Sequence, residues 1–147
     1  MFTGIIEALG TITEIQREDK KARLTITTGS EFSNFEAGES ISVNGVCLTA
    51  IQPGSTSFIV DVSTETLTRT GFSQIKKESQ VNLERSLTPS KKISGHFVSG
   101  HVDQIGSIVS IKHKTGEVLF RFKHPAIRPF HHRKGIHCCR WDQSDRF

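Results

Sequence analysis

The 147-residue sequence lacks several features that mark particular protein classes. It has three cysteines, of which Cys47 stands alone and Cys138 and Cys139 are adjacent. Adjacent cysteines rarely bridge each other, so no disulfide framework is expected. No apolar run reaches the roughly 18 residues of a membrane span, and the opening MFTGIIEALG lacks the basic region and long apolar stretch of a signal peptide. We therefore expect a cytoplasmic protein with no membrane partner.

Composition and charge favour an ordinary globular protein. Apolar residues make up 35% of the chain and charged residues 23%, which permits a packed core. The net charge is +4, but before residue 130 the basic residues alternate with Asp and Glu instead of clustering, so no nucleic-acid partner is expected. The length favours one complete domain plus a fragment.

The dominant hydrophobic period is two, which is typical of short antiparallel strands. Turn signals such as Asn44-Gly45 and Pro53-Gly54 leave little room for helices. A closed barrel or a sandwich is therefore expected. Short helices are predicted at Glu31–Phe35 and at Ser63–Thr70, where Ser63 or Thr64 can cap the first turn. The predicted strands are Thr11–Ile15, Arg23–Thr27, Ser40–Val43, Phe58–Val62 and Val81–Glu84.

The chain repeats itself. The decapeptide from Thr3 to Ile12 matches the one from Ser99 to Ile108 in residue type at nearly every place, an offset of 96 residues. Self-similarity at domain length indicates a duplicated fold. The likeness continues through residues 117–122, and the polar, proline-bearing stretch from Thr88 to Lys92 suits a connection between the copies. We expect the boundary near residues 88–97.

The composition changes abruptly at His131, where the alternation ends. His and Cys are zinc-ligand types, but their spacing here fits no CxxC or HxxxH arrangement, and no metal site is expected. A second interpretation is translation out of frame. With freely chosen codons, a one-nucleotide shift at His131 gives IIEKGSIAVDGISLTV, which mirrors the segment from Glu36 to Thr49 close to the duplication offset. Sequencing the gene across this point tests that hypothesis.

Five motifs in order carry a resemblance over roughly residues 1–130: MFTGIIE, SVNGVCLT, DVSTETL, VNLER and GHFVSGHV. Together they resemble riboflavin synthase. The resemblance implies an all-β fold with a pair of six-stranded antiparallel Greek-key closed barrels. In this chain we expect the first barrel at residues 1–97, an incomplete second copy at residues 98–130 and an atypical tail at residues 131–147. The resemblance also implies a homotrimer with active sites between barrels of neighbouring subunits.

The implied reaction passes a four-carbon unit between two 6,7-dimethyl-8-ribityllumazine molecules. The products are riboflavin and 5-amino-6-ribitylaminopyrimidinedione, and no metal or redox cofactor is implied. If the second barrel ends near residue 130, one barrel can hold a substrate without turning it over, because dismutation needs two stacked ligands. The alternatives are a non-catalytic lumazine- or flavin-binding protein and a generic β-barrel interaction domain. Self-association as a dimer is also open to such a chain.

The chemistry needs a flat slot for the ring, polar groups for the pyrimidine edge and ribityl chain, and help with proton loss from the 7-methyl group. By resemblance, Ser40 and Cys47 are the nucleophile or polarising candidates and His101 is the proton-handling candidate. The implied substrate-binding residues are Gly4, Ile5, Ile6, Cys47, Leu48, Thr49, Asp61, Val62, Ser63, Thr64, Glu65, Thr66, Gly100, His101 and Val102.

Each candidate also has a purely structural interpretation. Cys47 can be a small core residue, and Gly4 and Gly100 can mark turns or bulges. Thr49 and Thr66 can be ordinary strand and cap residues, and Glu65 can cap a helix or face water. His96, five residues before His101, is expected to be structural.

Overall fold

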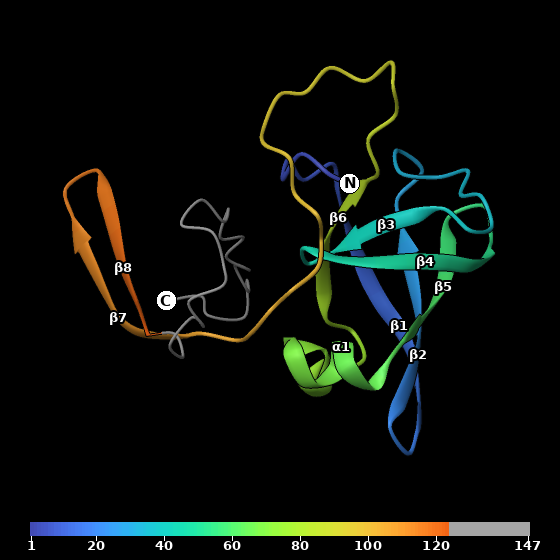
Figure 1. Cartoon of the computed structure of the whole chain (residues 1–147), viewed down its shortest axis with the longest axis horizontal. Coiled ribbons are helices and arrows are strands. Elements are labelled where there is room, and N and C mark those ends of the chain that lie inside the picture. The colour runs from blue at the N-terminus through green and yellow to red at the C-terminus, as the bar shows by residue number, and fades with distance from the viewer. Residues whose placement is uncertain (124–147) are drawn as a thin grey trace.

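The computed structural model describes residues 1–123, and these form one closed barrel followed by a separate β-hairpin (Figure 1). The barrel strands run in the order β1-β2-β5-β4-β3-β6, and every neighbouring pair is antiparallel. The predicted six-stranded Greek-key barrel is therefore confirmed. The predicted tail and the end of the second copy lie outside the described residues. The strands are β1 Ala8–Glu18, β2 Lys21–Thr28, β3 Ser40–Val43, β4 Val46–Pro53, β5 Ser57–Val62, β6 Gln80–Arg85, β7 Ser107–Lys114 and β8 Glu117–Lys123.

The alternation of the strands sorts side chains between the barrel interior and its outer face. In β4, Val46, Leu48 and Ala50 are buried in the core, whereas Cys47 and Thr49 point outward and are more exposed. The same period holds in β5, where Phe58 and Val60 are fully buried. Alternate burial of this kind follows from the pleat, which sends successive side chains to opposite faces.

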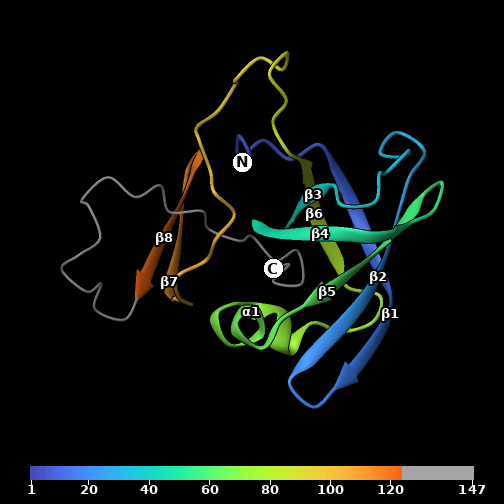
Figure 2. The same cartoon turned by 45° about the vertical axis from the view of Figure 1, so that its right-hand side comes forward.

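One of the two predicted helices is confirmed and the other is wrong. Helix α1 spans Thr64–Arg69 with Ser63 as its N-cap, and a 3-10 turn, η1, follows at Gly71–Gln74 (Figure 2). Residues 31–35 form no helix, because Asn34 has a φ of 60°, which a right-handed helix does not tolerate.

That irregular loop is held by packing at one end of the barrel. The rings of Phe32 and Phe35 lie 5.6 Å apart, and the guanidinium of Arg85 lies 5.0 and 5.2 Å from their centroids. Arg85 also donates to the Ser33 carbonyl and pairs with Glu39 at 2.9 Å. The Arg85 side chain thus links this loop to β6.

The hairpin of β7 and β8 repeats the hairpin of β1 and β2 at the offset of 96 residues. Thr11 pairs with Thr27 as Ser107 pairs with Lys123. Both hairpins carry an irregularity at the same place, between Ile12 and Glu14 in β1 and at the matching point of β7. This agreement supports the predicted duplication, with the described residues containing two strands of the second copy. Figures 1 and 2 show this hairpin standing apart from the barrel.

Candidate functional site

The outer face of β4 forms the floor of the candidate site. Cys47 pairs in register with Ser42, and Thr49 pairs with Ser40, on the neighbouring strand β3. On the other side Ala50 pairs with Val60 of β5, so antiparallel geometry brings Asp61 level with Thr49. Ser40, Cys47, Thr49 and Asp61 therefore share one face of the sheet.

A connecting segment at residues 95–102 reaches Cys47 beside the start of β4. The amide of Cys47 donates to the Gly100 carbonyl at 2.8 Å. Gly100 is buried and has a φ of 77°, and a Cβ on it would lie 2.8 Å from the Cys47 Cβ. Only glycine accommodates both the left-handed backbone and this close approach. Figure 1 shows the segment, in yellow to orange, looping away from β6 and returning past the start of β4.

The two residues after Gly100 differ in exposure. Val102 is half-buried and packs against the barrel core, whereas His101 is exposed. The His101 amide donates to the Ser99 hydroxyl at 3.2 Å. The structure therefore brings Gly100, His101 and Val102 to the start of β4, where Cys47 lies.

The start of α1 adds hydroxyl groups beside the end of β5. The Ser63 hydroxyl accepts from the Thr66 amide at 3.2 Å and lies 3.0 Å from the Thr66 hydroxyl. The Thr64 hydroxyl donates to the Lys20 carbonyl at 2.7 Å. A hydroxyl has one donor and two acceptor positions, so Ser63 and Thr66 retain capacity for a ligand. Glu65 is exposed and pairs with Arg69 within the helix at 3.2 Å.

Asp61 is engaged by a neighbouring cation. Arg23 donates to its two carboxylate oxygens at 2.7 and 2.8 Å. This hydrogen bond is the main cause that lowers the pKa of Asp61 from its ordinary value, against the smaller upward effect of desolvation. The carboxylate is therefore ionised at neutral pH, and it also raises the pKa of Arg23.

Some predicted site residues have side chains that point away from this face. Leu48 and Val62 are 5% and 1% exposed and belong to the barrel core, so only their backbone atoms can face a ligand there. Gly4 donates its amide to Glu84 of β6, and Ile5 and Ile6 are about half exposed. The segment from Gly4 to Ile6 thus runs beside β6 and not along β4.

Phe2 and Glu84 are not among the predicted site residues, yet they contact Gly100 and Gly4. Phe2 is fully buried, and its ring lies 3.0 Å from where a Gly100 Cβ would be. Glu84 is 2% exposed although the alternation of β6 turns it outward. Both occur in the motifs quoted above, but their burial depends on the N-terminal residues lying across the sheet, which no local pattern reveals.

The described residues offer no metal centre and no membrane helix. Within residues 1–123, no group of three or more His, Cys, Asp or Glu side chains is placed to hold a metal ion. None of the helices in this part of the chain is long and apolar enough to span a bilayer.

Comparison with known proteins gives consistent matches. The family model of the lumazine binding domain matches residues 3–86. Riboflavin synthases from Actinobacillus pleuropneumoniae and Bacillus subtilis (strain 168) are each 41% identical over 123 residues, covering 84% of this chain and 57% of each relative. Riboflavin synthase from Saccharomyces cerevisiae is 38% identical over 130 residues, covering 84% of this chain and 55% of that protein. The chain thus spans little more than half the length of these relatives.

Solved structures give the same fold. LumP complexed with riboflavin superposes with a TM-score of 0.73 at 24% identity, covering 85% of this chain and 68% of LumP. LumP complexed with 6,7-dimethyl-8-(1'-D-ribityl) lumazine gives a TM-score of 0.75 at 23% identity, covering 85% of this chain and 69% of LumP.

Proposed function

The chain belongs to the lumazine-binding-domain family, and from this premise we propose that its first barrel binds 6,7-dimethyl-8-ribityllumazine as part of a riboflavin synthase. The observation that carries the proposal is the contact of Gly100 with Cys47, which sets a second segment beside β4 at the edge of its outer face. The matched riboflavin synthases and the lumazine and riboflavin complexes of LumP support the choice of ligand.

The residues of this face suit the two parts of such a ligand. Backbone groups of β4 and the apolar side chain of Val102 suit the flat bicyclic ring and its pyrimidine edge. The hydroxyls of Thr49, Ser63 and Thr66 suit the ribityl chain. Because Asp61 is ionised and held by Arg23, we assign it to polar contacts with the ribityl end and not to proton transfer.

For the chemistry, proton removal from the 7-methyl group needs a base beside the ring. His101 is exposed and follows Gly100 directly in the chain, and we assign it this role. Cys47 and Ser40 lie on the same face, and we assign them to polarising or attacking the ring. The reaction moves a four-carbon unit between two lumazines and needs no external oxidant. Because the resemblance implies no metal, any activity is expected to survive a metal chelator.

From the duplication we assign Gly4, Ile5 and Ile6 to a second site, on the barrel of the second copy. They are the counterparts of Gly100, His101 and Val102 at the offset of 96 residues, and Gly4 repeats the positive φ of Gly100, 81° against 77°. Phe2 and Val98, which are also counterparts, exchange both backbone hydrogen bonds at 2.8 and 3.0 Å. A position paired with its own duplicate is what a two-fold axis between the copies requires. Each copy's leading segment would then cover the other copy's barrel.

Two candidate functions differ in whether the bound ligand reacts. A riboflavin synthase turns two stacked lumazines into riboflavin, whereas a binding protein, the function favoured by the LumP fold match, holds one. Incubation of the full chain with the lumazine, followed by chromatography of the products, separates them. Riboflavin and the pyrimidinedione in equal amounts support the first function. Binding without products supports the second function, and no binding contradicts both.

The remaining expectations stay predictions. Self-association, as a trimer or a dimer, is tested by size-exclusion chromatography with light scattering at several protein concentrations. A strictly monomeric profile that riboflavin leaves unchanged contradicts it. A cytoplasmic location and the lack of a nucleic-acid partner also stay predictions.

A further inference from the structure

A buried carboxylate joins β6 to the N-terminal residues. Glu84 is 2% exposed, and its Oε1 accepts from the amide and the hydroxyl of Thr3, both at 2.6 Å. Its Oε2 accepts from the Gly4 amide at 3.1 Å. A buried charge persists only when several donors replace its water, and here three donors do so. Glu84 thereby fixes where Thr3 lies along β6.

Thr3 in turn holds the connecting segment. Its carbonyl accepts from the His96 amide at 2.9 Å, and the adjacent Phe2 exchanges two backbone hydrogen bonds with Val98. Gly95 passes so close that a Cβ there would lie 2.2 Å from the Thr3 carbonyl oxygen. The N-terminal residues are therefore layered between β6 and residues 95–98.

The same segment reaches Cys47 two residues later. Gly100 accepts the Cys47 amide and is in close contact with both Cys47 and Phe2. An unbroken series of hydrogen bonds and packing contacts thus leads from Glu84 through Thr3 and the segment at 95–100 to the outer face of β4. A displacement of Thr3 must move this cover, because the intervening contacts are backbone hydrogen bonds with little freedom to stretch.

We propose that Glu84 is a positioning residue, which holds the cover at residues 95–102 against Cys47 by fixing Thr3. It acts through Thr3 and does not touch the ligand. The placement of the cover is independent of the ligand, whereas the effect on lumazine affinity rests on the proposed function. Neither candidate function, riboflavin synthase or lumazine-binding protein, by itself gives Glu84 this role.

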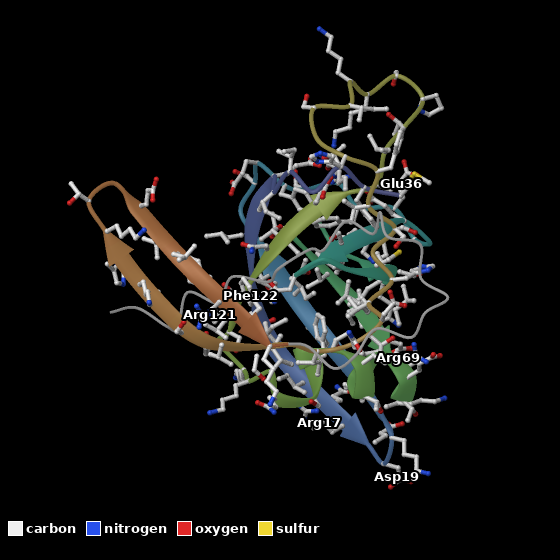
Figure 3. All side chains as sticks on the ribbon, turned by 60° about the vertical axis from the view of Figure 1, so that its left-hand side comes forward. Arg17, Asp19, Glu36, Arg69, Arg121 and Phe122 are labelled. Atoms are coloured by element: carbon white, nitrogen blue, oxygen red, sulfur yellow. The ribbon has the colours of Figure 1, made fainter. Side chains whose placement is uncertain are left out.

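Three variants test the proposal. Glu84→Gln keeps the shape of the side chain but turns an amide donor toward a backbone N–H. Thr3→Val removes the hydroxyl donor at constant shape, and Thr3→Ser restores it. Glu36→Gln is the matched control, because Glu36 is an exposed carboxylate on the loop before β3, outside this network (Figure 3).

The first measurement is amide hydrogen exchange of the full chain without ligand. For Glu84→Gln and Thr3→Val we expect exchange at Val98 and Cys47 to be faster by about tenfold, the factor that one charge-assisted hydrogen bond is worth. Exchange at Val60 in the barrel core should stay unchanged, and Thr3→Ser and Glu36→Gln should behave as the parent chain. Unchanged exchange at Val98 and Cys47 overturns the proposal. An equal rise at Val60 also overturns it, because Glu84 would then only stabilise the whole fold.

The second measurement is the dissociation constant for 6,7-dimethyl-8-ribityllumazine. We expect it to rise by about tenfold in Glu84→Gln and Thr3→Val, and to recover in Thr3→Ser. Faster exchange with unaltered affinity refutes the link between the cover and the ligand. If the parent chain binds no lumazine, the proposed function fails, while the exchange data still decide whether Glu84 places the cover.

Discussion

Replacing Gly100 with alanine tests whether the connecting segment must lie against β4. The new Cβ would lie 2.8 Å from the Cys47 Cβ, which is closer than packed atoms allow, and 3.0 Å from the Cys47 nitrogen, which is tighter than most packed contacts. The φ of 77° adds a left-handed cost of about 1–2 kcal/mol for any residue with a Cβ. Overpacking adds about 1–3 kcal/mol. We therefore expect Gly100→Ala to lower the free energy of unfolding by about 3 kcal/mol, or to displace the segment and break the bond to Cys47.

Two other glycines provide matched controls. Gly4 has a φ of 81°, and a Cβ there would meet Val98 at an ordinary 3.5 Å. Gly38 has a φ of 87° and open space around it. Gly4→Ala and Gly38→Ala should therefore show the backbone cost alone, about 1–2 kcal/mol. Urea unfolding and lumazine titration of the three variants give the comparison. If Gly100→Ala matches Gly38→Ala in both stability and affinity, the close contact with Cys47 does not exist.

Three further predictions concern Arg85, Asp61 and Cys47. Arg85→Leu loses a carboxylate partner and two ring contacts, so we expect urea unfolding to show a loss of about 2 kcal/mol, against at most about 0.5 kcal/mol for the exposed helix residue in Arg69→Leu. Equal losses of stability in Arg85→Leu and Arg69→Leu contradict the role of Arg85 in holding the loop at residues 31–35. The pKa of Asp61 is lowered in the fold, so its contribution to stability is full above the ordinary aspartate value and is lost as the pH falls through the lowered one. The stability difference between Asp61→Asn and the parent should therefore be constant above about pH 5 and shrink below about pH 4. A difference that persists to about pH 2 refutes the assigned pairing. With the two C-terminal cysteines changed to serine, labelling of Cys47 by a thiol reagent should slow about tenfold at a lumazine concentration of ten times the dissociation constant. Undiminished labelling places the ligand elsewhere.

Most of the fold could be predicted from local patterns. The alternation gave the strand Ser40–Val43 with the bounds observed, and the cap at Ser63 marked the start of α1. The duplication offset predicted a second copy of the fold, and the pair of β7 with β8 fits that prediction. These features depend on period, capping and self-similarity, which short stretches of sequence carry. The false helix at Glu31–Phe35 shows the limit, because the loop is shaped by contacts with Arg85 from a strand about fifty residues away.

The candidate site could be predicted only in part. The period of two correctly turns Cys47 and Thr49 outward, and the same period turns Leu48 and Val62 into the core. What the pattern does not contain is the path of the N-terminal and connecting segments across the outer face. That path buries Glu84, which the period alone leaves exposed to solvent. Such contacts join segments that are far apart in the sequence, so they depend on the tertiary structure and leave no local pattern.

The most direct test of the central claim is a nuclear magnetic resonance titration of the full chain with 6,7-dimethyl-8-ribityllumazine. We expect the amide signals of Cys47, Thr49, Gly100 and His101 to shift together, with one dissociation constant. The signals of the turn between β1 and β2 should not move. Shifts confined to other surfaces, or no shifts at saturating ligand, would contradict a lumazine site on the outer face of β4.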